Sequence, residues 1–98
     1  MQMVMIVFRT SMEGEVLPWI EHEKVPYTRL DGAQGKGASG TPGSLVWGGA
    51  NSVLLLALPD DRLVSFRDRA RAFERELDVQ QRAEVPFHIF VMPCIQWL

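Results

Sequence analysis

The sequence is short of cysteine, of net positive charge and of long hydrophobic runs, and each shortage excludes a class of protein. With one cysteine, Cys94, the chain can form neither an internal disulfide nor a four-cysteine zinc site. The formal net charge of -2 leaves no broad basic field for a phosphate backbone. We therefore expect a cytoplasmic protein that does not bind nucleic acid.

The apolar start of the chain, MQMVMIVF, is too short to be a membrane span. It ends at Arg9, well before the roughly 20 residues that a transmembrane helix needs, and it lacks the basic region and cleavage site of a signal peptide. The chain has 98 residues, of which 47% are hydrophobic, enough for one core and too few for two. We expect a single domain over residues 1–98, with no direct membrane insertion.

What the sequence does contain is four short segments of strand type. Two are continuous apolar runs rich in Val, Ile and Leu, and two alternate residues of different polarity. The predicted strands cover residues 3–8, 27–30, 52–58 and 86–93.

Two helices are predicted between these strands. In the first, Thr10 and Glu13 have the spacing of a capping box, and Pro18 predicts a kink or a late start because proline removes a hydrogen bond inside a helix. In the second, Asp60 is the expected N-cap. Apolar residues then recur at offsets of three, seven, ten and fourteen, which forms one stripe along a helix. This stripe consists of Leu63, Phe66, Ala70, Phe73 and Leu77.

The order strand, helix, strand, strand, helix, strand predicts a fold of the α+β class. Two right-handed βαβ units joined by a hairpin give a ferredoxin-like βαββαβ sandwich, a four-stranded antiparallel sheet with both helices on one face. The strands at 3–8 and 52–58 are apolar throughout, so the second face of the sheet would be an exposed apolar patch in a monomer. We therefore expect self-association.

Seven of the eight glycines lie between Asp31 and Ser52, in the connection between the second and third strands. A plain hairpin would use about two to five residues, so the excess indicates either a functional loop or a flexible extension. Two details favour a ligand. Trp47 lies beside two glycines, which suits a ring packed against close backbone, and the triplet GKG at 35–37 offers backbone N–H groups around one cation.

Together these segments resemble the PII and PII-like signalling superfamily, which includes the CutA-type proteins. The resemblance is carried by MVMIVFR at the start, GAQGKGASG after the second strand, SVLLLAL as the third and FHIFVMP as the last. It implies a homotrimer whose sheets face the threefold axis. It also implies that a loop over about residues 32–49 corresponds to the T-loop, which contacts a partner protein and changes shape when a small ligand occupies the intersubunit cleft. A membrane transporter is the partner class that such proteins often accompany.

The resemblance places the ligand near Gly35, Lys36 and Gly37, with Trp47 and Arg82 as further candidates. PII proteins have a glycine-rich loop with a lysine before the last strand, and arginines after it. Here that loop reads QQRAEVPF, with Arg82 as its one cation, and the chain ends CIQWL. These departures argue against ATP binding in the PII manner and leave the ligand open: a nucleotide, another small anion, or none.

A CutA-like trimeric metal-binding protein is the first alternative. His88 and Cys94 are its candidate ligands, because three copies meeting at an axis can assemble a site without any local motif. His22, in the polar stretch EHEK, is expected to be a solvated helix residue instead.

An acylphosphatase-type hydrolase is the second alternative, because ferredoxin-like folds also carry enzymes. It would need an arginine in a phosphate loop and an asparagine for the attacking water, and Arg9 and Asn51 are the residues available. No phosphate-loop pattern surrounds Arg9, so we expect no enzymatic activity. The charged run over 67–78 is expected to be a solvated helix face, with Arg67 or Arg71 a candidate for an intersubunit cleft.

Overall fold

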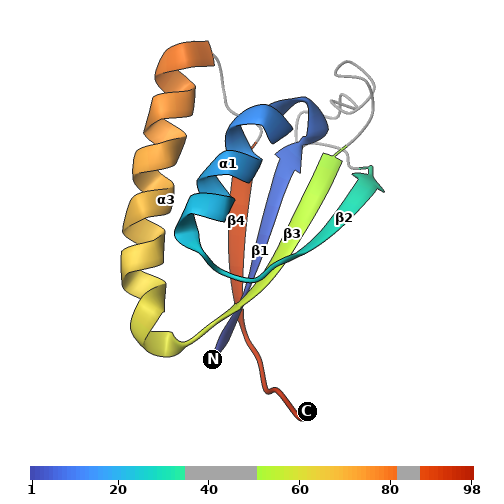
Figure 1. Cartoon of the computed structure of the whole chain (residues 1–98), viewed down its shortest axis with the longest axis vertical. Coiled ribbons are helices and arrows are strands. Elements are labelled where there is room, and N and C mark those ends of the chain that lie inside the picture. The colour runs from blue at the N-terminus through green and yellow to red at the C-terminus, as the bar shows by residue number, and fades with distance from the viewer. Residues whose placement is uncertain (35–50, 82–86) are drawn as a thin grey trace.

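The structure, a computed structural model, describes residues 1–34, 51–81 and 87–98 (Figure 1). Its elements are β1 (Gln2–Arg9), the 3-10 turn η1 (Thr10–Met12), α1 (Glu13–Glu23), β2 (Thr28–Ala33), β3 (Asn51–Leu58), α3 (Asp60–Gln81) and β4 (Phe87–Pro93). The strands form one antiparallel sheet in the order β2-β3-β1-β4. The predicted ferredoxin-like α+β sandwich is confirmed.

The core lies between the sheet and the two helices, which cover the same face (Figure 1). Because side chains alternate along a strand, every second residue of the two central strands points into it. From β1 and β3 these are Val4, Ile6, Phe8, Leu54, Leu56 and Leu58, all buried. The predicted stripe of α3 is confirmed as its core side: Phe66, Ala70 and Leu77 are buried, and Leu63 and Phe73 pack against the core.

An aromatic cluster joins the two helices to the sheet. Trp19 of α1 stacks on Phe73 of α3, with ring centroids 4.7 Å apart and planes 5° from parallel. Phe87, the first residue of β4, meets both rings edge-on at 6.0 and 5.5 Å. Offset and edge-on ring pairs of this kind contribute beyond their buried area.

The other face of the sheet, which we name the open face, is apolar as well, and no other described residue covers it. Cross-strand register arranges its side chains in three rows: Leu30, Val53, Val7 and His88; Thr28, Leu55, Met5 and Phe90; Ala57, Met3 and Met92. Phe90 is 52% exposed and Leu30 is 49% exposed. The predicted apolar second face is therefore present.

The surface of α3 that points away from the core is charged. It carries arginines and acidic residues, with Arg67 Nε 3.9 Å from Asp68 Oδ1. Among the residues that the structure describes, neither helix combines the length and the apolar character needed to cross a bilayer.

The helix ends differ from the sequence prediction in three details. Thr10 caps neither η1 nor α1, because its hydroxyl is bonded to Ser52 at 2.9 Å. The predicted late start at Pro18 is wrong, since α1 begins well before it and is anchored in the core two residues on either side. Asp60 is the first residue of α3 rather than the residue before it, and its carboxylate lies 2.9 Å from the terminal ammonium of Met1.

The strand β2 extends further than predicted. It includes Asp31, Gly32 and Ala33, so the first residues assigned to the loop over 32–49 belong to the sheet. The register shifts between Leu30 and Ala33, and Gly32 has φ 75°. A bulge with a left-handed residue explains why glycine occupies this position.

Candidate functional site

One end of the sheet brackets the glycine-rich segment. At this end β2 finishes at Ala33 and β3 begins at Asn51, which pairs with Ala33 on one side and with Arg9 of β1 on the other. The predicted place of the segment, between the second and third strands, is confirmed. The candidate contacts Gly35, Lys36, Gly37, Trp47 and Arg82 lie outside the described residues and remain predictions.

A connected set of polar side chains crosses this end of the sheet. Arg29 of β2 donates to Glu13 Oε2 of α1 and to Asp31 Oδ1, each at 2.7 Å. Ser52 of β3 donates to the same Asp31 oxygen at 2.8 Å and lies 2.9 Å from the Thr10 hydroxyl. Because Ser52 has a single hydroxyl proton, which Asp31 receives, Thr10 is the donor in the last bond. We name these five residues the polar chain.

Strand alternation explains why the members of the polar chain meet. Arg29 and Asp31 are two residues apart, so they share one side of β2. That side faces the helices, because Arg29 pairs with the buried Leu54. Ser52 lies on the same side of β3 and is 0% exposed. The sequence analysis assigned these residues only to strands; the available signal was a polar residue at a core-facing position of an apolar strand.

The polar chain keeps Asp31 charged. Hydrogen bonds from Ser52 and then from Arg29 hold the pKa of Asp31 below its ordinary 3.8. The pKa of Arg29 is raised, first by its bond to Glu13 and then by Asp31. One guanidinium is thus shared between two carboxylates. An anion arriving at this end of the sheet would compete with them for Arg29.

A second arginine, Arg9, lies at the same end but on the opposite side of the sheet. It follows Phe8, which points into the core, so its own side chain belongs to the open face. Burial lowers the pKa of Arg9. Asn51 is its cross-strand partner. The structure therefore brings together the arginine and the asparagine considered for an acylphosphatase-type site.

The candidate metal ligands His88 and Cys94 do not meet within one chain. His88 is exposed on the open face near the start of β4, and Cys94 follows the other end of that strand, roughly 20 Å away at about 3.3 Å per residue. Over residues 1–34, 51–81 and 87–98, no three His, Cys, Asp or Glu side chains are grouped so that they could hold a metal ion. A site built from His88 or Cys94 would need several chains, and it stays a prediction.

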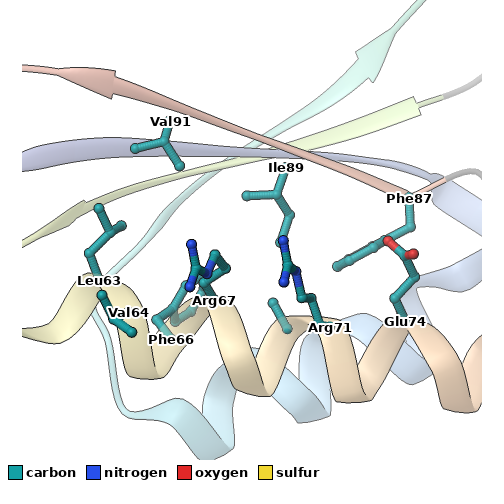
Figure 2. A pocket seen from close by; sticks show the side chains of 10 residues that line it. Leu63, Val64, Phe66, Arg67, Arg71, Glu74, Phe87, Ile89 and Val91 are labelled. Atoms are coloured by element: carbon teal, nitrogen blue, oxygen red, sulfur yellow. The ribbon is translucent and has the colours of Figure 1, made fainter.

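A second hollow, which we name the α3–β4 groove, lies between that helix and that strand (Figure 2). Its volume is about 450 Å³, and its apolar lining consists of Leu63, Val64, Phe66, Ala70, Phe87, Ile89 and Val91. Arg67 and Arg71 extend from α3 toward β4 across it (Figure 2). The two arginines considered for a cleft therefore line this one.

The polar stretch EHEK contains a buried charge that its composition does not reveal. His22 is exposed, as predicted. The side chain of Glu23 is only 4% exposed and accepts a hydrogen bond from Arg69 Nε at 2.6 Å. This pair ties the end of α1 to α3, so we assign it a structural role.

The comparisons with known proteins were informative for the fold and not for the sequence. No protein-family model and no curated protein matches the chain. Among solved structures, CPII from Thiomonas intermedia K12, bound to ADP, AMP and acetate, has a TM-score of 0.64 over 93% of this chain and 82% of that one, at 13% identity. The fold is that of the PII-like signalling proteins.

Two further structures agree with this PII-like fold. One is CPII, described as a nitrogen regulatory PII-like protein, bound to ADP, AMP and bicarbonate; its TM-score is 0.64 at 17% identity, over 92% of this chain and 81% of that one. The other, from Thermus thermophilus, is described as PII-like signalling, with a TM-score of 0.54 at 21% identity over 92% and 82%. The resemblance inferred from the sequence is confirmed in the fold.

Proposed function

We propose that this chain is a PII-like regulatory protein that works as a homotrimer in the cytoplasm. A small ligand binds at the clefts between subunits, and the segment over 35–50 passes this information to a partner protein. The observation that carries the proposal is the PII-like fold, with the polar chain at the base of that segment. Its role is regulation, so we expect no catalytic turnover.

The homotrimer is proposed because the open face needs a cover. Its rows consist largely of Met, Val, Leu and Phe, and Phe90 is more than half exposed in a single chain. Exposed apolar patches of this kind mark interaction surfaces. Three open faces around one axis would cover each other and leave the charged outer surface of α3 in water.

The ligand is proposed to be a nucleotide or another small anion. Arg29 already serves Glu13 and Asp31, so an anion that takes one of its N–H groups displaces a carboxylate. Releasing Asp31 would free the end of β2, immediately before the glycine-rich segment. Binding would then change which conformations of that segment a partner can meet.

The solved neighbours support the choice of first candidates. The structures of CPII contain ADP and AMP, together with acetate or bicarbonate. For the partner we favour a membrane transporter, by analogy with the class of proteins that PII-like regulators accompany.

Isothermal titration calorimetry with ADP, AMP and bicarbonate tests the ligand. We expect one of them to bind, and Lys36→Gln to weaken its binding about tenfold or more, since a charge-assisted hydrogen bond is lost. The chain has one other lysine, Lys24, which is exposed at the end of α1, so Lys24→Gln is the matched control. Absence of binding by all three anions, or equal losses in the two variants, would contradict the proposed site.

A trimeric metal-binding protein is a second candidate, favoured by the exposure of His88 on the open face. A trimer built on that face would bring three copies of His88 toward one another. Titration with Zn²⁺ should then show binding that His88→Ala removes. Hydrolysis of acetyl phosphate that Asn51→Ala abolishes would instead indicate the hydrolase alternative.

A further inference from the structure

The α3–β4 groove has no part in the proposed ligand site, yet its composition is that of a binding surface. It opens beside β4, which is the outermost strand on that side of the described sheet. Val64 on its helical wall is 59% exposed and Val91 on its strand wall is 47% exposed. An apolar hollow along an edge strand fits an extended chain that presents apolar side chains at alternate positions.

The residues that follow β4 form a segment of this kind. Ile95, Trp97 and Leu98 are 84%, 89% and 110% exposed, the highest values among the exposed large hydrophobic side chains of the described residues. Ile95 and Trp97 are two residues apart, so in an extended chain they point to the same side. We name residues 95–98 the tail. Its exposed indole and aliphatic groups are surfaces that gain free energy when they are buried.

The tail does not occupy the groove of its own chain. After β4 it runs away from α3, whereas the groove lies between β4 and α3 (Figures 1 and 2). Tail and groove are therefore two different surfaces of one chain, each apolar and each uncovered. Contacts between two different surfaces of identical chains are head-to-tail, and a set of them can close into a ring.

We propose that the tail of one copy lies in the α3–β4 groove of the next copy. Ile95 and Trp97 enter the groove between its helical and strand walls, whose volume of about 450 Å³ is in the range of sites that hold ligands of this size. The guanidinium of Arg67 or Arg71, both of which reach across the groove, stacks on the Trp97 indole as a cation–π contact. The inference rests on the self-association in the proposed function, and adds to it a contact separate from the open face.

Sedimentation velocity of full-length variants across a range of concentrations tests this contact. Trp97→Ser in the tail and Val64→Glu in the groove should each raise the concentration needed for half-maximal assembly about tenfold or more. The double variant should be no weaker than the weaker single variant, because both changes break the same contact. Gln96→Ser is the control for the tail, and Ser65→Glu, an exposed neighbour outside the groove with the same charge change, is the control for α3.

Each other outcome overturns the inference in a recognisable way. A trimer unaffected by Trp97→Ser and Val64→Glu leaves the open-face assembly intact and excludes the tail contact. Losses that add in the double variant mean that tail and groove contact different partners. Unchanged assembly with non-additive losses of unfolding free energy would put the tail in its own groove. A wild-type monomer would remove self-association, and with it the proposed function as well.

Discussion

The two faces of β1 have similar composition and opposite surroundings. Toward the helices it presents Val4, Ile6 and Phe8, none more than 1% exposed. The residues that alternate with them on the open face are Met and Val, and these are only half-buried. The difference shows that apolar character alone does not bury a strand face; a second layer must cover it. On one face α1 and α3 supply that layer, and on the other we assign it to further copies of the chain.

The largest effect should come from a charge on the open face. Phe90→Glu would place one carboxylate per chain in the proposed apolar interface, where an unpaired charge is strongly unfavourable. We expect complete loss of assembly in sedimentation velocity, with an unchanged circular dichroism spectrum because Phe90 lies outside the core. Phe90→Leu is the control and should still assemble. A Phe90→Glu variant that assembles like the wild type would show that the open face is not the interface.

Adjacent leucines of β3 compare the two faces directly. Leu56 is 1% exposed and faces the helices, whereas Leu55 pairs with Met5 on the open face. In the Phe90→Glu background, Leu56→Ala should lower the free energy of unfolding by about 2–5 kcal/mol, because it leaves a cavity. Leu55→Ala should cost less than about 1 kcal/mol in that background, since its site is partly open to water. Equal losses in urea denaturation would mean that the open face is covered within one chain.

A smaller effect is expected in the polar chain. Ser52→Ala removes a buried hydroxyl and leaves Asp31 and Thr10 each without one partner. We expect a loss of about 1–2 kcal/mol in the free energy of unfolding. Ser65→Ala is the matched control, because the Ser65 hydroxyl is exposed and bonds only to its own helix; it should change stability by less than about 0.5 kcal/mol. Similar losses in both variants would contradict the account of Ser52.

The smallest effect is a pH dependence. Because the folded pKa of Asp31 is below 3.8, its contribution to stability is present above pH 3.8 and is lost as the pH falls through the folded value. Asp31→Asn should therefore flatten the acid limb of stability between about pH 4 and pH 2. Urea denaturation at several pH values measures this. An identical acid limb in the variant would show that Asp31 is not held by Ser52 and Arg29.

The sequence was sufficient for the architecture because periodicity determined it. The apolar runs gave all four strands, and the stripe from Leu63 to Leu77 gave α3 and its buried side. Element ends were less predictable, since they depend on partners far away in the chain. Thr10 has the spacing of a cap but bonds to Ser52, 42 residues further on.

The candidate site was predictable only in position. Composition located the glycine-rich segment between two strands, but nothing local indicated that Arg29 would join Glu13 to Asp31. That arrangement requires α1, β2 and β3 to be in register. The exposed tail and the groove likewise became candidates for contact only when the fold showed both to be uncovered.

Sedimentation velocity of the wild-type chain at micromolar concentration tests the central claim most directly. Covering of the open face by identical chains predicts a trimer of this 11.1 kDa protein. A single species sedimenting as a monomer would contradict the account, because the apolar rows of the open face would then be stable in water without a partner.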